Sequence, residues 1–500
     1  MNIMDIILFN PPRYRNGSHH KFNNALLWLA SYLVQRKVKV RVVALNDDQF
    51  EATIRREIVT YKPKFAAVAC KWWDTLYSSS YVASLIKKHD PNIVTITGGH
   101  TASFFAHELV EKTDFDVVIR GDGEDPLYTH VAGGRSANCV LTGDKEPVPV
   151  RRGYVQIQET LKDISLVDHL EDIISDTAVL NSYIWTGKGC LEHCVYCSGN
   201  VWNSALNFGR AQIIYRPLEV VHRDIEILSR FPNGTRITFD FDPNQGQVQQ
   251  TYYLDLFRGL EPKRFNCYFF SWSLPSKDLV DALAETFNFV ELCLDVQTGS
   301  ERLRKLLGDR RMIKPFFSDQ SIENLLDHIS RYRNFVVDMS SLMGLPFERS
   351  EDVEAIVVFS DYFYDKCHFL RYPYISPMNV EPGSLLMRNP KYYGMVLFRK
   401  SFDDFMQYTK RNFEMNINCY QPELYEKGLF HPLGVAPIED YKSGDVFRVY
   451  ETWKKIQKHI DRRSNERMLL RAQKYQEYGL MKVGIKGGID RGSPRYIEVE

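Results

Sequence analysis

The chain has 500 residues, which is enough for two to four domains of about 100 to 200 residues each. Its 63 lysines and arginines balance 63 aspartates and glutamates, and this zero formal charge excludes a general nucleic-acid binder, whose phosphate contacts need a cationic excess. Hydrophobic residues make up 44% and charged residues 25%, a globular composition that excludes wholesale disorder.

The first part of the chain predicts a doubly wound α/β domain. Short β-branched runs alternate with longer amphipathic stretches, the first of which repeats apolar residues from Leu26 to Leu33 at helical spacing. Near-continuous apolar strands separated by helices indicate a parallel sheet that is covered on both faces. The predicted strands are Ile3–Phe9, Val38–Ala44, Phe65–Ala69, Ile93–Thr97 and Val117–Ile119.

Short polar or glycine-containing loops follow these strands, at the carboxyl ends where such sheets bind ligands. A glycine pair lets the backbone approach a bulky ligand, although a tight turn alone would also explain Gly98 and Gly99. No GxGxxG motif follows the first strand, which disfavours a dinucleotide. The candidate ligand residues are Asn10, Pro11, Lys71, Trp72, Gly98, Gly99, His100, Gly121, Gly123 and Glu124.

A less regular stretch from about Ala132 to Val179 separates this domain from a second alternation of strands and helices. Six strands separated by helix-length segments predict a partial (β/α)6 barrel. The predicted strands are Tyr183–Thr186, Arg236–Phe241, Asn266–Ser271, Phe289–Asp295, Phe335–Met343 and His368–Ile375. We expect a Rossmann-like domain at 1–135, a linker or extension at 136–180, the barrel at 181–395 and a mostly helical C-terminal domain at 396–500.

The C-terminal region predicts helices at Asp403–Asn418 and Val446–Tyr478. The second helix is rich in lysine and arginine, as at Lys454, Lys458 and Arg467. An anionic partner and a solvated helix face both explain this charge, and the sequence favours the solvated face.

The pattern of cysteines and apolar runs indicates the compartment. No run approaches the about 20 apolar residues of a membrane helix, and the N-terminal residues lack the basic and apolar pattern of a secretory signal. Nine cysteines, an odd number, fit a reducing compartment better than a disulfide framework. We therefore expect a cytoplasmic protein without a membrane partner.

Three of these cysteines, Cys190, Cys194 and Cys197, have CxxxCxxC spacing. Thiolates are the soft ligands that iron-sulfur clusters require, and such a loop wraps three corners of a four-iron cluster. Three ligands leave one iron open to a substrate or cofactor. A zinc site completed by His193 or by a distant residue is the alternative, but zinc sites usually pair two half-sites, and the sequence has no second CxxC or HxxxH.

The cysteine motif, with an aromatic residue before its last cysteine, resembles the signature of the radical S-adenosylmethionine (radical SAM) superfamily. Segments 238–244, 294–300, 343–348 and 381–384 are similar to later motifs of this superfamily in the same order, although 295–297 departs from the usual Glu-Ser. The resemblance implies a 4Fe-4S cluster, SAM as its ligand, and SAM-binding roles for Tyr196, Asp240, Asp242, Gln297, Gly344, Leu345 and Pro346.

Segments 98–102 and 116–124 make the N-terminal part resemble the cobalamin-binding domain that often precedes this barrel. The resemblance implies that the strand-end residues listed above bind cobalamin. The Asp-x-His-x-x-Gly element that gives cobalt a lower axial histidine is missing, because Ala44–Phe50 stands in its place. Some cobalamin-dependent radical SAM proteins also lack it. The domain either binds cobalamin with an unligated lower face or has lost it, and the strand-end loops favour binding.

The function that this resemblance implies is cobalamin-dependent radical SAM methylation of an unactivated carbon in a small-molecule or peptide natural product, with flavodoxin or ferredoxin as electron donor. A radical rearrangement, cyclisation or oxidation is the alternative among enzymes, and a zinc-binding interaction protein is the alternative outside them. Methylthio transfer is disfavoured because the sequence has no second cysteine triplet. Tyr372 and Tyr374 are candidates for substrate contact, although strand aromatics are usually core, and no catalytic acid or base is evident.

Overall fold

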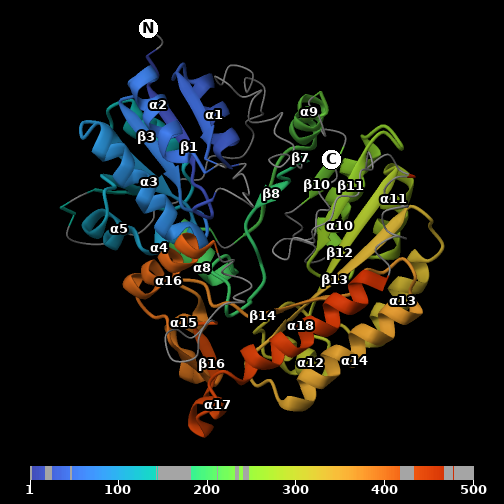
Figure 1. Cartoon of the computed structure of the whole chain (residues 1–500). Coiled ribbons are helices and arrows are strands. Elements are labelled where there is room, and N and C mark those ends of the chain that lie inside the picture. Colours follow the sequence, from blue (N-terminus) through green and yellow to red (C-terminus); the bar gives the residue numbers. More distant parts are fainter. Residues whose placement is uncertain are drawn as a thin grey trace.

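The computed structural model describes residues 3–16, 25–45, 48–141, 143–144, 182–210, 212–230, 236–239, 247–416, 433–466 and 477. Within these ranges, two six-stranded sheets stand side by side, and helices of the C-terminal region extend along both (Figure 1). No helix of this part is both long and apolar enough to cross a membrane.

The N-terminal sheet has the strand order β2-β1-β3-β4-β5-β6. Strands β1 to β5 are parallel, and β6 pairs antiparallel with β5. Because the order reverses between β1 and β3, this is the flavodoxin-like variant of a doubly wound sheet, and ligands are expected at that point. The strands are β1 (Ile6–Asn10), β2 (Val40–Ala44), β3 (Phe65–Ala69), β4 (Val94–Gly98), β5 (Val117–Ile119) and β6 (Cys139–Leu141).

Alternate residues of β1 pack into opposite layers, as the pleat of a strand requires. Ile6 and Leu8 pack with apolar residues of α1, whereas Ile7 and Phe9 pack with α2 and α3. All the strands predicted for this domain are present, and β6 extends the sheet beyond the boundary expected at residue 135. The helices are α1 (Ala25–Gln35), α2 (Phe50–Tyr61), η1 (Trp73–Thr75), α3 (Leu76–His89), α4 (His100–Phe104), α5 (Ala106–Lys112) and α6 (Glu124–Val131).

The second sheet has the order β7-β10-β11-β12-β13-β14, and each neighbouring pair is parallel. Buried residues such as Phe239, Phe269 and Leu292 form its core. Its strands are β7 (Ser182–Tyr183), β10 (Arg236–Phe239), β11 (Asn266–Ser271), β12 (Phe289–Gln297), β13 (Phe335–Met343) and β14 (Tyr374–Pro377). The helices are α8 (Val201–Phe208), α9 (Leu218–Leu228), α10 (Gln247–Arg258), α11 (Lys277–Thr286), α12 (Glu301–Asp309), α13 (Asp319–Ile329) and α14 (Ser350–Lys366).

A short antiparallel pair, β8 (Gly187–Lys188) with β9 (Ile214–Tyr215), lies between β7 and β10 in sequence and flanks the cysteine loop and α8. The sequence did not predict this pair, because two-residue strands carry almost no periodicity.

The sixth barrel strand begins later than the predicted His368–Ile375. Leu370 makes a single bridge with Val337, whose carbonyl accepts the N–H of Arg371 at 2.9 Å. Pro373 has no amide hydrogen and cannot continue this pairing. The ladder therefore resumes only at Tyr374.

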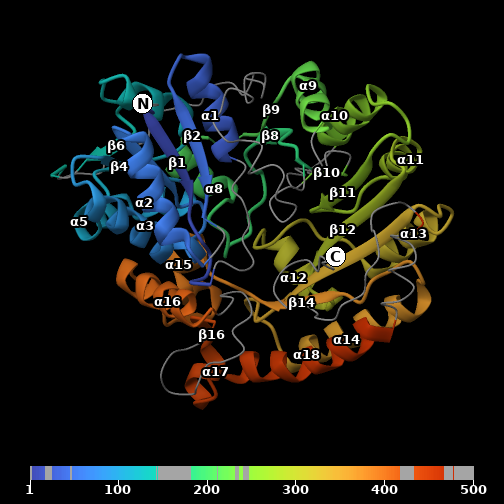
Figure 2. The same ribbon diagram turned by 45° about the horizontal axis from the view of Figure 1, so that its top comes forward.

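The C-terminal region divides between the two sheets. Helix α16 (Phe402–Met415) packs its aromatic residues into the N-terminal core, and α18 (Arg448–Glu466) lies beside α14 (Figures 1 and 2). Trp453 of α18 is 1% exposed and donates its Nε1–H to the carbonyl of Ile375 on β14 at 3.2 Å. The remaining elements are α15 (Leu385–Arg388), η3 (Pro390–Tyr393), β15 (Met395–Leu397), β16 (Val435–Pro437) and α17 (Ile438–Ser443).

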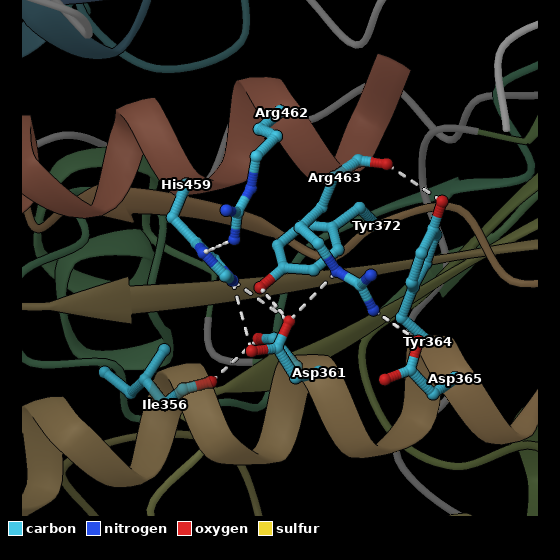
Figure 3. Close-up of polar contacts among 9 residues, drawn as sticks. Ile356, Asp361, Tyr364, Asp365, Tyr372, His459, Arg462 and Arg463 are labelled. Carbon is cyan, nitrogen blue, oxygen red and sulfur yellow. Dashed lines mark hydrogen bonds and ion pairs between the residues drawn. The ribbon is translucent and has the colours of Figure 1, made fainter. Parts of the chain in front are cut away.

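A polar cluster centred on Asp361 joins α18 to α14 (Figure 3). The hydroxyl of Tyr372 donates to Asp361 Oδ1 at 3.1 Å, and His459 Nε2 lies 3.0 Å from the same oxygen. Arg463 pairs with both Asp361 and Asp365. Part of the basic surface predicted for this helix therefore faces acidic side chains of α14.

Trp453→Ala is expected to destabilise the chain by about 3 to 5 kcal/mol, because it removes a buried indole and leaves a cavity. Urea unfolding followed by far-UV circular dichroism measures the change. Val358→Ala on α14 is the control, since Val358 is 69% exposed and its truncation is expected to change stability by less than about 0.5 kcal/mol. Equal unfolding midpoints for the two variants would contradict a stabilising role of α18.

Candidate functional site

The three cysteines of the CxxxCxxC motif lie on one loop between β8 and α8. Cys194 is 5% exposed, and Cys190 and Cys197 are partly buried. Two main-chain groups donate to sulfur: the N–H of Glu192 reaches Cys190 Sγ at 3.3 Å, and the N–H of Gly199 reaches Cys197 Sγ at 3.2 Å. Hydrogen bonds of this kind stabilise thiolate ligands.

Burial raises the pKa of Cys194 to about 12 and the pKa of Cys197 well above its ordinary value. Without a metal these thiols are neutral, so a bound metal must displace their protons. Within the described residues, no three Cys, His, Asp or Glu side chains converge on a site for a single ion. In a four-iron cluster each thiolate binds a different iron, so its ligands lie farther apart, and this donor set fits such a cluster.

The barrel supports the cysteine loop from two sides. The N–H of Val195 donates to the carbonyl of Met312 at 2.9 Å. The carboxylate of Glu381 accepts the N–H of Ser198 at 2.6 Å, and the N–H of Glu381 donates to the carbonyl of Tyr196 at 2.9 Å. The turn at 381–384, which follows the sixth strand, therefore holds the cysteine loop, a role that the sequence motif did not reveal.

Two residues predicted to bind SAM contact each other. The hydroxyl of Tyr196 donates to Gln297 Oε1 at 2.8 Å. Gln297 has a φ of 68°, at a point where the register of β12 against β13 shifts. A non-glycine residue in this left-handed region is strained, and such residues cluster at functional sites. The end of β12 is therefore held against the cysteine loop.

The predicted SAM-binding residues Gly344, Leu345 and Pro346 are buried just after β13. Gly344 has a φ of 79°, and a Cβ there would lie 2.9 Å from Cγ1 of Val449 on α18, so this position requires glycine. The N–H of Gly344 donates to Glu348 Oε2 at 2.6 Å. Burial raises the pKa of Glu348 to about 8, so most of this carboxyl group is protonated at neutral pH.

Two hydroxyl groups on barrel strands are buried without a hydrogen-bond partner among the described residues: Thr238 on β10 and Ser341 on β13. Unpaired buried polar atoms are uncommon in folded proteins, and these two fit a polar ligand in the barrel. Asp240 and Asp242, which the sequence predicts as SAM ligands after β10, lie outside the described residues.

Aromatic and glycine residues form the carboxyl edge of the N-terminal sheet. The rings of Trp72 and His100 stack with centroids 5.0 Å apart and planes 3° apart. Gly99 has a φ of 125°, and a Cβ there would lie 2.5 Å from the carbonyl oxygen of Cys70, so only glycine lets the two loops cross. Burial lowers the pKa of His100 to about 3, and the charge of Lys71 adds to this effect. The imidazole is therefore neutral, and its Nδ1 has no partner within the described residues.

The other predicted cobalamin residues belong to neighbouring loops of the same edge. Asn10, which is 2% exposed, ends β1 and is followed by the buried Pro11, while Gly98 ends β4. Gly121 donates its N–H to a serine hydroxyl of α4 at 3.0 Å, and Gly123 precedes α6. The structure therefore places these residues at the edge where the sequence predicts a ligand.

The two predicted cofactor regions meet at Gly199, just after the last cysteine of the motif. A Cβ on Gly199 would lie 3.6 Å from Cys197 Sγ, 3.9 Å from His100 Cε1 and 4.0 Å from Trp72 Cη2. Phe208 of α8 also contacts His100, with ring centroids 4.5 Å apart. The cysteine loop therefore lies directly against the N-terminal ligand loops.

Four largely buried charges hold this arrangement in place. Asp122 pairs with Arg210 at 2.8 Å and with Lys188 at 3.5 Å, and Lys188 also pairs with Glu124. Burial opposes the charge of Asp122, but the two cations outweigh it and lower the pKa of Asp122. Glu124, predicted as a cobalamin ligand, therefore pairs with Lys188 of the segment that leads into the cysteine loop. Sequence reasoning missed Lys188 and Arg210, although Lys188 stands two residues before the first motif cysteine.

The two tyrosines predicted to contact substrate lie in different environments. The hydroxyl of Tyr372 is bound to Asp361 between α14 and α18 (Figure 3), whereas Tyr374 is 39% exposed on β14. The contacts of Tyr372 are those of a residue that packs α18. A substrate role for either tyrosine stays a prediction.

Comparisons with known proteins agree with this arrangement. A B12-binding domain family matches residues 17–130. The chain is 27% identical over 248 residues to an anaerobic magnesium-protoporphyrin IX monomethyl ester cyclase of Rubrivivax gelatinosus, covering 44% of this chain and 42% of the cyclase. It is 21% identical over 363 residues to an uncharacterized methyltransferase of Pyrococcus horikoshii, covering 67% of this chain and 72% of that protein. The match to the cyclase thus spans less than half of its length.

Two solved structures of TsrM from Kitasatospora setae, a radical SAM methyltransferase, are similar to this chain. The structure with cobalamin and a 4Fe-4S cluster has a TM-score of 0.61 at 16% identity and covers 79% of this chain and 77% of that chain. The structure with tryptophan and a SAM analogue has a TM-score of 0.58 at 16% identity and covers 76% and 74%. These findings confirm the predicted fold class, and the matched family agrees with the resemblance of the N-terminal part to a cobalamin-binding domain.

Lys188→Met is expected to weaken the contact between the N-terminal domain and the cysteine loop, because it leaves the buried charge of Glu124 uncompensated. Removing one partner of a buried ion pair costs about 3 to 5 kcal/mol, which urea unfolding measures. Lys442→Met is the control, since Lys442 and its partner Glu439 are 63% and 78% exposed. Equal losses in the two variants would show that the buried charges do not fix the domains.

Glu348→Gln is expected to become more stable relative to the wild type as pH rises. The folded-state pKa of Glu348, about 8, lies above its ordinary value of 4.5, so the wild type loses stability as pH rises through this interval. The glutamine has no proton to lose. Urea unfolding of both proteins at about pH 5 and about pH 8 measures the difference, and a difference independent of pH would contradict the raised pKa.

Proposed function

We propose that the chain is a cobalamin-dependent radical SAM enzyme that methylates an unactivated carbon of a small-molecule or peptide natural product. The observation that carries this proposal is the contact at Gly199 between the cysteine loop and the predicted cobalamin loops. Methyl transfer to a substrate radical needs both cofactor sites around one substrate, and this contact supplies that proximity.

The chain's own residues would hold and orient the reacting groups. When bound, the cluster, SAM and cobalamin supply the radical and methyl-transfer chemistry. Cys190, Cys194 and Cys197 would bind three irons and leave the fourth open to SAM. The N–H groups of Glu192 and Gly199 stabilise charge on the sulfurs.

The carboxyl edge of the N-terminal sheet would bind cobalamin. Trp72 and His100 offer a flat stacked surface there, and His100 is neutral because burial lowers its pKa to about 3. The segment 44–50 has no histidine, so it would supply no imidazole to a bound cobalamin.

The solved relatives support this proposal. TsrM has the same fold and was solved with cobalamin, a 4Fe-4S cluster and its tryptophan substrate. For this chain we propose a small-molecule or peptide substrate, a flavodoxin or ferredoxin type of electron donor, and a cytoplasmic location, with neither nucleic acid nor membrane as a partner.

A second candidate is a radical rearrangement, cyclisation or oxidation, with or without cobalamin. The 27% identity to the cyclase over 248 residues favours it. Both candidates are enzymes, and the likeness of the chain to a cyclase and to methyltransferases supports them over a zinc-binding interaction protein.

Anaerobic reconstitution with iron, sulfide and cobalamin tests the proposal. We expect a brown protein with about four irons per chain, bound cobalamin, and turnover of SAM to both S-adenosylhomocysteine and 5′-deoxyadenosine. Production of 5′-deoxyadenosine alone would favour the second candidate. Stoichiometric zinc without SAM cleavage would overturn both.

Cys194→Ala is expected to lose the cluster and SAM cleavage, because one of three ligands is removed. Cys293→Ala is the matched control, since Cys293 is also buried, at 7% exposure, but lies on β12 outside the motif. Iron and sulfide analysis of both variants measures the effect. Full iron content in Cys194→Ala would contradict the assignment of the cluster ligands.

A further inference from the structure

Lys314 is a buried cation beside the cysteine loop, in the segment between α12 and α13. The residue is 8% exposed. Met312, two positions earlier, accepts the N–H of Val195 at 2.9 Å. The backbone that carries Lys314 is therefore joined directly to the loop that carries the motif cysteines.

The ammonium group of Lys314 sits in a defined pocket of side chains. It pairs with Asp295 of β12 and lies 5.9 Å from the ring centroid of Phe270 and 5.1 Å from that of Trp272. The hydroxyl of Ser340 donates to the other oxygen of Asp295 at 3.2 Å and holds the carboxylate in place. A buried lysine is costly to desolvate unless it is paired, so this site is built to hold a charge.

The side chain of Lys314 stays charged in this buried position. Burial lowers the pKa of Lys314, but the ion pair with Asp295 opposes burial and keeps the ammonium charged. A buried positive charge therefore lies in the segment that is hydrogen-bonded to the cysteine loop.

A second connection leads from Lys314 back to the cysteine loop. Asp295 Oδ1 accepts the N–H of Gln297 at 3.3 Å, and the side chain of Gln297 accepts the hydroxyl of Tyr196 at 2.8 Å. Lys314, Asp295 and Gln297 thus link the end of β12 to the motif. The ion pair of Lys314 with Asp295 and the hydrogen bond of Tyr196 with Gln297 fix the positions of these side chains.

We propose that Lys314 is a positioning residue for the redox step, whose charge raises the reduction potential of a cluster held by Cys190, Cys194 and Cys197, and that Asp295 limits this rise. The inference rests on the proposed function, since it takes these cysteines to hold a 4Fe-4S cluster. One electron passes from a flavodoxin or ferredoxin type of donor, which is oxidised, to the cluster, which is reduced. This adds a negative charge near the ammonium in low-dielectric surroundings, so the cation favours the reduced state.

Redox titration of the reconstituted protein, followed by electron paramagnetic resonance of the reduced cluster, tests this proposal without an activity assay. Lys314→Met keeps the length of the side chain and removes its charge. We expect the ratio of reduced to oxidised cluster to fall about tenfold at a fixed potential, which is about 59 mV for a one-electron couple. Lys314→Arg keeps the charge and is expected to stay near the wild type.

Asp295→Asn is expected to raise the reduction potential of the cluster, because it removes the neighbouring negative charge and leaves the ammonium of Lys314. A general structural disturbance would not raise the potential, so this variant separates electrostatics from misfolding. Lys87→Met is the matched control: Lys87 pairs with Asp116 at 2.6 Å at the amino edge of the N-terminal sheet, away from the cysteine loop. Its potential is expected to match the wild type.

The outcomes separate this inference from the proposed function. A full cluster with an unchanged potential in Lys314→Met overturns the role of Lys314 and leaves the proposed function intact. If Lys314→Met does not assemble a cluster, the reduction potential of Asp295→Asn provides the test. A potential in that variant no higher than in the wild type overturns the inference. Failure of the wild type to assemble any cluster overturns the proposed function itself.

Discussion

The pairing of Lys188 and Arg210 with Asp122 and Glu124 decides where the cysteine loop lies. The two cations flank the loop and α8 in sequence, and the two carboxylates follow the last parallel strand of the N-terminal sheet. An unpaired charge in this buried position would be costly, so the pairs tolerate little displacement. The distance between the two predicted cofactor regions is therefore set by the chain itself, and a cofactor would enter a site that is already arranged.

Close contact between the two halves also depends on positions without a side chain. Gly199 brings the cysteine loop against the rings of the N-terminal loops, and Gly383 does the same for the turn after the sixth strand. A Cβ on Gly383 would lie 2.6 Å from the ring of Phe104 in α4. Because this turn also holds the cysteine loop through Glu381, three separate segments meet around one place. The site belongs to neither sheet alone.

Hydrophobic patterning predicted most strands because they are apolar runs, and Phe65–Ala69 has the bounds that the sequence indicated. The sixth barrel strand begins later than predicted, because Pro373 interrupts the hydrogen bonding of an otherwise strand-like segment. The motif was enough to predict three cluster ligands, since the three cysteines lie close together in the chain. Arg210, Lys314 and Glu381 escaped prediction for the opposite reason. A single charged residue shows no sign of its partner when that partner is remote in sequence.

Helix α18 lies along β14, the last strand of the barrel sheet in the described residues. Trp453 of α18 donates a hydrogen bond to one main-chain carbonyl of this strand. The outer side of such a strand offers unpaired N–H and C=O groups to any other extended chain. A barrel fragment that stops before residue 448 would leave this side uncovered and would aggregate through strand addition. A soluble fragment for crystallisation or isotope labelling therefore needs to retain α18, although the helix lies far along the chain from the cysteine motif.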